Sequence, residues 1–348
     1  MEREIDIFIP GRLCLFGEHS DWAATYREQN PMINKGYSIV LGIDKGVYLK
    51  AYKNEKFEYV YDKQSIKIDN IKKLEEFDPF FDYIVSAAKL VTQKYQVEGI
   101  KIICTKMTLP IKKGLASSAA ICMAIVRAYN QVYSLKISIE EEMKLAYQAE
   151  NLIGSKCGKL DQICAYGKGI RFIEFDKEYI VSKNINIKQN LYYLLVDLNS
   201  SKNTKKILDN LNNEYPFPKD KKCLNLYRAL GKINEGINRK AKVYIETANI
   251  KKLGLLMNKA QLVFDKNVSE YSSELKAPRL HNLILFLKKV EGVLGIKGVG
   301  SQGDGMAQVL VENEKIQNIK KIIEKNYNYE VYEICANNDK FIERSLKI

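Results

Sequence analysis

The sequence has few of the residues on which several enzyme classes depend. It contains only two histidines, His19 and His281, and seven cysteines among 348 residues. A Ser-His-Asp hydrolase would have to use one of these histidines, and His281 lies in a Leu-His-Asn-Leu-Ile pattern typical of a helix. The cysteines form no C-x-x-C pair, so a zinc site would lack closely spaced ligands. These absences argue against a hydrolase of this type and against a zinc protein, and we expect reduced, structural thiols.

The chain also lacks a long apolar run and a concentrated basic block. It begins with Met-Glu-Arg-Glu-Ile-Asp, where a signal peptide would need apolar residues, and no stretch is long enough to span a bilayer. We therefore expect a cytoplasmic protein with no membrane partner. The formal net charge is +13, but the lysines are interspersed with acidic residues and asparagine, and no nucleic-acid-binding motif accompanies them. We expect no nucleic acid partner, and the chain is equally compatible with a monomer or a homodimer.

The order of apolar patterns predicts a mixed fold. Strands are indicated at 5–16 (broken by Pro10-Gly11), 37–52, 57–61, 99–105, 170–182, 191–198, 295–297, 306–311 and 329–335. Helices are indicated at 80–95, 121–133, 203–265, 280–291 and 314–325, and the capping box Ser138-Ile-Glu-Glu141 opens another that ends near Gly154. This mixture predicts an α+β protein. A polar segment near residue 185 predicts two domains, 1–185 and 186–348.

The segment Leu109-Pro-Ile-Lys-Lys-Gly-Leu-Ala-Ser-Ser-Ala-Ala120 is typical of a phosphate-binding loop. Gly114 allows close backbone approach to an anion, and Ser117 and Ser118 supply hydroxyls where a helix begins. The N–H groups of a helix's first turn lack intrahelical partners, and the helix dipole is positive there. The two lysines before the glycine add positive charge. The Walker A spacing is absent, and by itself the segment is equally typical of an ordinary helix cap.

Three further segments accompany this loop along the chain. They are Pro10-Gly-Arg-Leu-Cys-Leu-Phe-Gly-Glu-His-Ser-Asp-Trp22, Ala149-Glu-Asn-Leu-Ile-Gly-Ser-Lys-Cys-Gly-Lys-Leu-Asp-Gln162 and Gly298-Val-Gly-Ser-Gln-Gly-Asp-Gly305. In this order the four segments resemble the signature motifs of the GHMP kinases, the superfamily of galactokinase, homoserine kinase, mevalonate kinase and phosphomevalonate kinase. The segment 149–162 is similar to the galactokinase type. The motifs are spread from residue 10 to residue 305, so the resemblance extends over nearly the whole chain.

The resemblance implies both a fold and a reaction. The implied fold has a ribosomal-protein-S5-domain-2-like N-terminal domain and a ferredoxin-like C-terminal domain, with the active site in the cleft between them. The implied reaction is transfer of the γ-phosphoryl group of ATP, with Mg²⁺, to a hydroxyl of a small molecule. Such a reaction depends on positioning and charge stabilisation more than on covalent catalysis.

The resemblance also implies roles for individual residues. Asp161 would accept or orient the proton of the acceptor hydroxyl, and Arg12 would keep that carboxylate ionised and stabilise charge on the γ-phosphoryl group. Ser118 and Glu150 would bind Mg²⁺. A surface strand position for Arg12 and a solvated helix position for Glu150 are the structural alternatives. The implied ATP contacts are Lys113, Gly114, Leu115, Ala116, Ser117, Ser118, Ala119, Gly300 and Gly303.

The first motif indicates the acceptor. Glu18, His19 and Asp21 can surround a polyhydroxylated ligand, because carboxylates accept hydrogen bonds from vicinal hydroxyls. Galactokinases carry Gly-Glu-His-Thr-Asp-Tyr here, whereas mevalonate kinases lack the Asp. The resemblance therefore implies a sugar acceptor and a sugar 1-phosphate product. Trp22, the only tryptophan, either stacks on the sugar or packs in the core.

The last motif departs from the family pattern. Galactokinases have a Gly-Gly-Gly-Phe-Gly-Gly type of loop, whereas this chain has Gly300-Ser-Gln-Gly-Asp-Gly305. Gln302 is unusual, and Asp304 would repel phosphates unless it points away or meets a cation. The sugar therefore stays open among galactose, arabinose, fucose, a uronic acid and a heptose phosphate. A mevalonate-type kinase and a GHMP-fold ligand sensor without turnover are the alternative functions.

Overall fold

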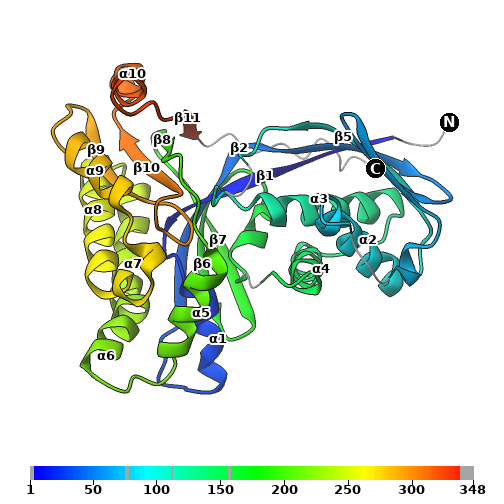
Figure 1. The fold of residues 1–348 in the computed structure, drawn as a ribbon, viewed down its shortest axis with the longest axis horizontal. Coiled ribbons are helices and arrows are strands. Elements are labelled where there is room, and N and C mark those ends of the chain that lie inside the picture. Colours follow the sequence, from blue (N-terminus) through cyan, green and yellow to red (C-terminus); the bar gives the residue numbers. More distant parts are fainter. Residues whose placement is uncertain (1–3, 75–77, 111–112, 156–157, 338–348) are drawn as a thin grey trace. The chain divides into compact units, whose positions relative to one another are not determined.

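The computed structural model describes residues 4–74, 78–110, 113–155 and 158–337. The chain forms two compact units, one of Met1–Arg12 with Asp44–Gly167 and one of Leu13–Ile43 with Lys168–Ile348. Strands β1 (Ile5–Phe16) and β2 (Gly36–Lys53) contribute residues to both (Figure 1). This division differs from a boundary at residue 185, because 13–43 pack with the later residues. The assignment of family domains to 1–185 and 186–348, and of a site between them, stays a prediction.

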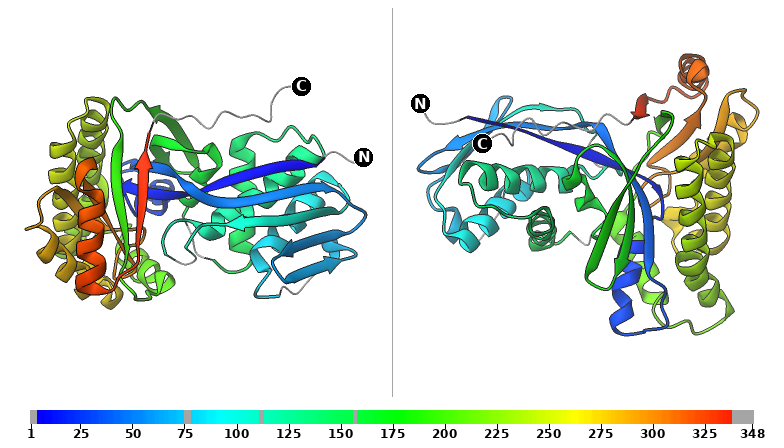
Figure 2. Two further views of the ribbon diagram at one scale, coloured as in Figure 1. Left: turned by 90° about the horizontal axis from the view of Figure 1, so that it is seen from above. Right: turned by 180° about the vertical axis from the view of Figure 1, so that it is seen from behind.

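The first unit combines strands with three longer helices. Its other elements are β3 (Phe57–Tyr61), β4 (Gln64–Ile68), η2 (Ile71–Lys73), α2 (Asp82–Tyr95), β5 (Ile100–Met107), α3 (Ser117–Val132), α4 (Ile139–Leu152) and η3 (Asp161–Tyr166). β3 pairs with β4 in antiparallel and with β5 in parallel orientation, and β5 pairs with the second half of β2. The three helices cover one face of these strands (Figures 1 and 2). The short helix η3 packs against both α3 and α4.

The second unit contains two sets of strands and a group of helices. Its elements are α1 (Ser20–Thr25), η1 (Tyr26–Glu28), β6 (Gly169–Asp176), β7 (Tyr179–Ile185), β8 (Leu191–Asp197), α5 (Thr204–Glu214), α6 (Lys221–Arg228), η4 (Ala229–Ile233), α7 (Asn234–Glu246), α8 (Ile250–Asn267), η5 (Ser269–Tyr271), η6 (Ser273–Leu275), α9 (Pro278–Leu287), β9 (Val293–Gly298), β10 (Met306–Val311), η7 (Asn313–Lys315), α10 (Ile316–Tyr327) and β11 (Val331–Ala336). An antiparallel sheet has the order β11-β8-β10-β9. The first half of β2 pairs with β6, which pairs with β7.

Most of the predicted elements are present, and Ser138 is confirmed as the N-cap of the predicted helix. Ser138 Oγ accepts a hydrogen bond from the Glu141 N–H at 3.2 Å, where α4 begins. The predicted break at Pro10-Gly11 is wrong, since β1 runs through both residues. Gly11 is needed there because a Cβ would lie 2.3 Å from Leu109 Cδ2 and 2.9 Å from Leu115 O. α3 begins earlier than expected, and α1 and β4 were not predicted because each is short and has no clear period.

The six cysteines that the structure describes are free thiols. Five are buried and Cys335 is exposed, while Cys157 lies outside the described residues. In the part of the chain that is described, no helix has both the length and the apolar character needed to cross a membrane.

Gly254 sets how closely α8 approaches β9. A Cβ on Gly254 would lie 2.2 Å from Leu294 O, a backbone atom that cannot move alone. We expect Gly254→Ala to lower the free energy of unfolding by about 1–3 kcal/mol, as overpacking does. A Cβ on Gly236 in α7 would meet no atom within 4 Å, so Gly236→Ala is the control and should stabilise by up to about 1 kcal/mol. Urea unfolding measures both, and equal stabilities would contradict this packing.

Candidate active site

In the predicted phosphate-binding segment, a strained loop that includes Gly114 and Ala116 leads into α3, while Lys112 lies outside the described residues. Gly114 and Ala116 both have left-handed backbone, with φ of +80° and +60°. Ala116 is the residue before the helix and supplies no side-chain cap to the N–H groups of the first turn. A non-glycine residue in this region costs about 1–2 kcal/mol, and such strain is typical of functional sites. Of the other predicted ATP contacts in this loop, Lys113, Ser117 and Ser118 are half-buried, and Leu115 and Ala119 are buried.

Arg12 connects this loop to the candidate catalytic carboxylate. Its backbone N–H donates to Leu115 O at 3.1 Å, and its Nη1 donates to Gly114 O at 2.6 Å. Its Nη2 forms an ion pair with Asp161. The Arg12 side chain is only 5% exposed, whereas that of Asp161 is 26% exposed. Arg12 is therefore not a surface strand residue, and the structure brings together Arg12, the loop and Asp161 as the motifs imply.

Glu150 is buried near the end of α4, so the alternative of a solvated helix glutamate is wrong. It is 1% exposed, as is Gln162 on the short helix η3. Gln162 Nε2 donates to Glu150 Oε2 at 2.5 Å. Gln162 directly follows Asp161. It therefore connects the segment that carries Asp161 to the Glu150 carboxylate.

Arg127 makes partly buried contacts that no sequence motif indicates. It lies on α3, and its Nε and Nη2 donate to Glu142 Oε2 at 3.0 and 2.5 Å. Its Nη2 also donates to Ala165 O, on η3, at 3.0 Å. Asn130 Nδ2 donates to the other Glu142 oxygen at 2.7 Å. This network connects α3 and α4 to the short helix that carries Asp161. The only indication of it in the sequence is an arginine among the apolar residues of the helix.

Cys164 lies in the same part of the first unit but does not add a nucleophile. It is 1% exposed, and this burial raises the pKa of its thiol, with the nearby Asp161 and Glu150 carboxylates acting in the same direction. The thiol therefore stays protonated at neutral pH, whereas the thiolate is the reactive form.

The first motif continues in the second unit, where His19 is held as a neutral ring. Its Nδ1 accepts a hydrogen bond from Trp22 Nε1 at 3.0 Å, and the ring stacks on Phe264. Burial lowers the pKa of His19 to about 4; the Ser301 backbone opposes this shift and the Lys202 and Lys297 charges add to it. His19 Nε2 is therefore left as the N–H donor. It is buried and has no hydrogen bond of normal geometry to the described residues, although the Ser301 backbone lies close enough to the ring to raise its pKa.

Asp21 and Trp22 of this motif both lie in the first turn of α1. Asp21 is 7% exposed. Trp22 belongs to an apolar cluster of the second unit and packs edge-to-face on Tyr215. Of the two alternatives for Trp22, the structure therefore favours packing in the core.

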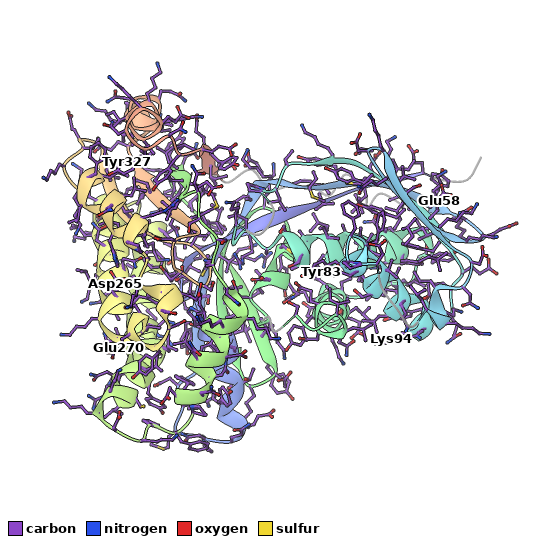
Figure 3. All side chains as sticks on the ribbon, in the orientation of Figure 1. Glu58, Tyr83, Lys94, Asp265, Glu270 and Tyr327 are labelled. Carbon is purple, nitrogen blue, oxygen red and sulfur yellow. The ribbon has the colours of Figure 1, made fainter. Side chains whose placement is uncertain are left out.

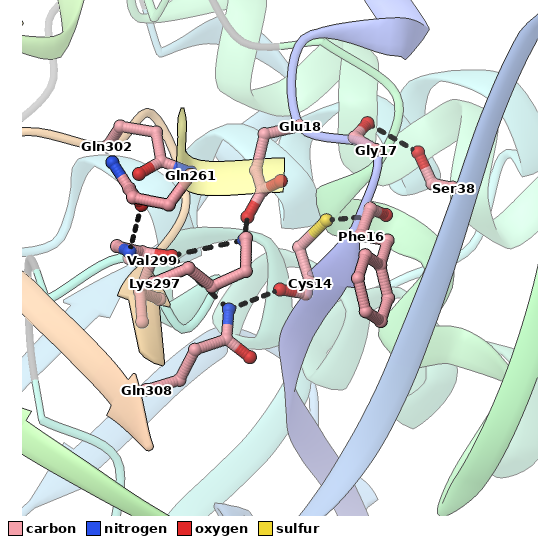
Figure 4. Close-up of polar contacts among 12 residues, drawn as sticks. Cys14, Phe16, Gly17, Glu18, Ser38, Gln261, Lys297, Val299, Gln302 and Gln308 are labelled. Carbon is pink, nitrogen blue, oxygen red and sulfur yellow. Dashed lines mark hydrogen bonds and ion pairs between the residues drawn. The ribbon is translucent and has the colours of Figure 1, made fainter. Parts of the chain in front are cut away.

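Glu18 has a partner that lies far away in the sequence. It forms an ion pair with Lys297 on β9, in which the two side chains are 8% and 1% exposed (Figure 4). The only hint in the sequence is a lysine within the apolar strand Val293–Gly298. Isolated buried ammonium groups are costly, so such a lysine predicts a carboxylate partner without saying which one.

The last motif, Gly298–Gly305, forms a tight turn held by Lys202. Gly300, Gln302 and Gly303 all have positive φ, at +63°, +67° and +77°. Lys202 Nζ donates to Val299 O at 2.9 Å and to Gln302 O at 2.5 Å. The glycines at 300 and 303 are thus required by the turn itself, and their contact with ATP stays a prediction.

The Asp304 carboxylate binds the start of a helix, so the structure gives it a role other than phosphate binding. The carboxylate accepts from the Leu280 N–H at 2.9 Å and from the Arg279 N–H at 3.2 Å, at the start of α9. The residue before this helix, Ala277, has no side-chain acceptor of its own. Asp304 is therefore an N-terminal cap supplied by another segment, and it meets the positive end of a helix dipole.

His281 is the other histidine, and its surroundings are unlike those of a hydrolase triad. It is a half-exposed residue of α9, and its Nε2 lies 3.2 Å from Asp265 Oδ2 on α8 (Asp265 is labelled in Figure 3). The neighbour that the structure gives this ring nitrogen is a carboxylate, whereas a triad would place a serine or cysteine nucleophile there.

Comparisons with known proteins test the resemblance to GHMP kinases. Residues 82–169 match the family described as GHMP kinases N terminal domain. A galactokinase of Thermosipho africanus (strain TCF52B) is 24% identical over 91% of this chain and 92% of its own length. The structure of Lactococcus lactis galactokinase complexed with galactose has a TM-score of 0.75 at 18% identity, covering 95% of this chain and 93% of that one. The Methanococcus jannaschii mevalonate kinase has a TM-score of 0.74 at 21% identity, covering 96% and 98%.

These findings confirm the resemblance to GHMP kinases and the α+β fold. The family match covers α2, α3, α4 and η3, which are the elements that carry Ser118, Glu150 and Asp161. The roles of the individual residues stay predictions.

The pH dependence of stability tests the environment of His19. The folded chain binds a proton on His19 with a pKa of about 4, against 6.5 for an ordinary histidine. Between these values the unfolded state holds more protons, so the His19 contribution is complete above pH 6.5 and is lost as the pH falls toward 4. At about 1.4 kcal/mol per pKa unit, it amounts to roughly 3 kcal/mol.

Urea unfolding at a series of pH values checks this against His19→Gln, which lacks the titration. The difference in unfolding free energy between wild type and variant should shrink as the pH is lowered from 6.5 to 4. A difference that is constant with pH would mean that His19 is accessible to solvent.

Proposed function

We propose that this chain, which carries a GHMP kinase N-terminal domain and is homologous to galactokinase over nine-tenths of its length, transfers the γ-phosphoryl group of ATP to a sugar hydroxyl. The proposed product is a sugar 1-phosphate. The observation that carries the proposal is the buried Arg12 guanidinium, bound at once to the loop carbonyl of Gly114 and to Asp161. One arginine thereby lies next to both the proposed phosphate loop and the proposed base.

The proposed reaction follows from what these groups can do. The acceptor hydroxyl donates a hydrogen bond to Asp161, whose side chain reaches solvent. As the new bond from the hydroxyl oxygen to the γ-phosphorus forms, the bond from that phosphorus to the bridging oxygen breaks and ADP leaves. Because an alcohol is a weak acid, its proton passes to Asp161 late in a loose transition state. Arg12, which is always charged, stabilises the negative charge that develops on the transferred group.

The motif residues Ser118 and Glu150 carry oxygen atoms of the kind that a magnesium ion prefers. Within the described residues, no group of three or more His, Cys, Asp and Glu side chains is arranged to hold a metal. Mg²⁺ needs fewer protein ligands than this, because substrate phosphates and waters complete its shell of oxygen atoms. We propose that the Glu150 carboxylate and the Ser118 hydroxyl bind it. When bound, the ion would neutralise phosphate charge.

In the proposed acceptor site, Glu18, His19 and Asp21 contact the sugar. The neutral His19 ring can donate from Nε2, and the two carboxylates can accept from hydroxyls. A donor beside two acceptors suits vicinal hydroxyl groups, each of which donates one hydrogen bond and accepts others.

A coupled assay of ADP release with Mg-ATP tests the function. The acceptors are galactose, arabinose, fucose, a uronic acid, a heptose phosphate and mevalonate. We expect turnover with a sugar, with one ADP formed per sugar consumed and little ADP formed without acceptor. Turnover with mevalonate alone would reject a sugar as the acceptor. ATP binding without turnover on any acceptor would favour a sensor.

Two variants separate the proposed roles of the carboxylates. Asp161→Asn keeps the shape and removes the charge, so kcat should fall by about 100-fold or more while the ATP Kd stays unchanged. Glu150→Gln should instead raise the Mg²⁺ concentration needed for half-maximal velocity. Glu140→Gln, on the exposed part of the same helix, is the control. A magnesium titration of Glu150→Gln identical to that of the control would remove Glu150 from the site.

A further inference from the structure

Two buried polar side chains interrupt the apolar strands β9 and β10. Lys297 is 1% exposed and Gln308 is 0% exposed. They are directly opposite in the antiparallel register, and opposite residues point to the same face of a sheet. Burying an ammonium group and an amide in a sheet is unfavourable unless both find partners. The partners therefore indicate what these two residues do.

Both side chains reach the first motif, Gln308 near the end of β1 and Lys297 just after that strand. Gln308 Nε2 donates to Cys14 O at 2.8 Å and to Gly298 O at 3.3 Å. Lys297 Nζ pairs with the Glu18 carboxylate and donates to Gly298 O at 3.2 Å (Figure 4). Gln308 thus binds backbone carbonyls, whereas Lys297 binds the side chain of Glu18, a residue proposed to contact the sugar.

We propose that Lys297 is a positioning residue for the acceptor site, which acts by fixing the direction of the Glu18 carboxylate. This inference rests on the proposed function, in which Glu18 accepts hydrogen bonds from sugar hydroxyls. An ion pair with a nearly inaccessible lysine removes the rotational freedom of that carboxylate before the sugar arrives. The hydroxyls then meet an acceptor that is already oriented, and less ordering is needed on binding.

Lys297 also contributes charge to the surroundings of the site. Its ammonium group is among those that lower the pKa of His19, after burial and together with Lys202. The same lysine therefore keeps Glu18 in place and helps to keep the neighbouring histidine neutral. Both effects favour the hydrogen-bonding pattern that a neutral, hydroxyl-rich ligand needs.

The kinetics of Lys297→Met and Gln308→Met separate positioning from general stability. Both variants remove a buried polar group from the same face of one sheet. Lys297→Met should raise the KM and Kd for the sugar about 10- to 100-fold and leave the KM for ATP unchanged. Gln308→Met should lower the melting temperature with little change in the KM for sugar. Lys297→Arg, which keeps the charge and several donors, should retain most of the sugar affinity.

The double variant Glu18→Gln with Lys297→Met keeps the test valid if Lys297→Met alone does not fold. It replaces the buried pair with two neutral side chains, so no uncompensated charge remains. If Lys297 acts through Glu18, its removal adds nothing to the loss of sugar affinity caused by Glu18→Gln. Additive losses would overturn the inference, and so would a wild-type KM for sugar in Lys297→Met. A wild-type protein that phosphorylates no sugar would reject the proposed function, and this inference with it.

Discussion

The geometry of the first unit depends on the burial of one guanidinium group. The Arg12 side chain is 5% exposed and cannot lose its charge at any ordinary pH. Taking such a group out of water is costly unless each part of it is hydrogen-bonded, and removing one partner leaves an uncompensated charge. The carbonyl of Gly114 accepts from Nη1, and the carboxylate of Asp161 pairs with Nη2. β1, the loop before α3 and the short helix η3 must therefore be in place together.

The same physical rule applies to other charged side chains that have little exposure to solvent. Arg127 pairs with Glu142 and with the carbonyl of Ala165, and Lys297 pairs with Glu18. Each charge lies on an otherwise apolar element and is satisfied by a segment distant in the sequence. In low dielectric surroundings such networks are strong when complete and costly when incomplete. They fix the relative positions of loops that apolar packing alone would leave adjustable.

This dependence on distant partners explains what the sequence could and could not predict. The strands and helices with a clear apolar period were predicted, and so were Arg12 and Asp161, because each lies in a recognisable motif. Lys297 and Arg127 were missed because a local pattern does not identify a partner far along the chain. The break at Pro10-Gly11 was predicted from local preference, but pairing with β2 and close packing on Leu109 keep the strand continuous.

The departure at Asp304 bears on stability more than on the choice of substrate. A carboxylate in a glycine-rich turn suggests repulsion of phosphates, yet this one caps the first turn of α9. The helix begins with Pro278, and the preceding Ala277 offers no acceptor, so a cap from another segment is favourable there. An acidic residue at position 304 is therefore explained by the unpaired N–H groups in the first turn of α9, which it binds. The determinants of the acceptor are better sought around Glu18, His19 and Asp21, whose polar side chains are all nearly buried.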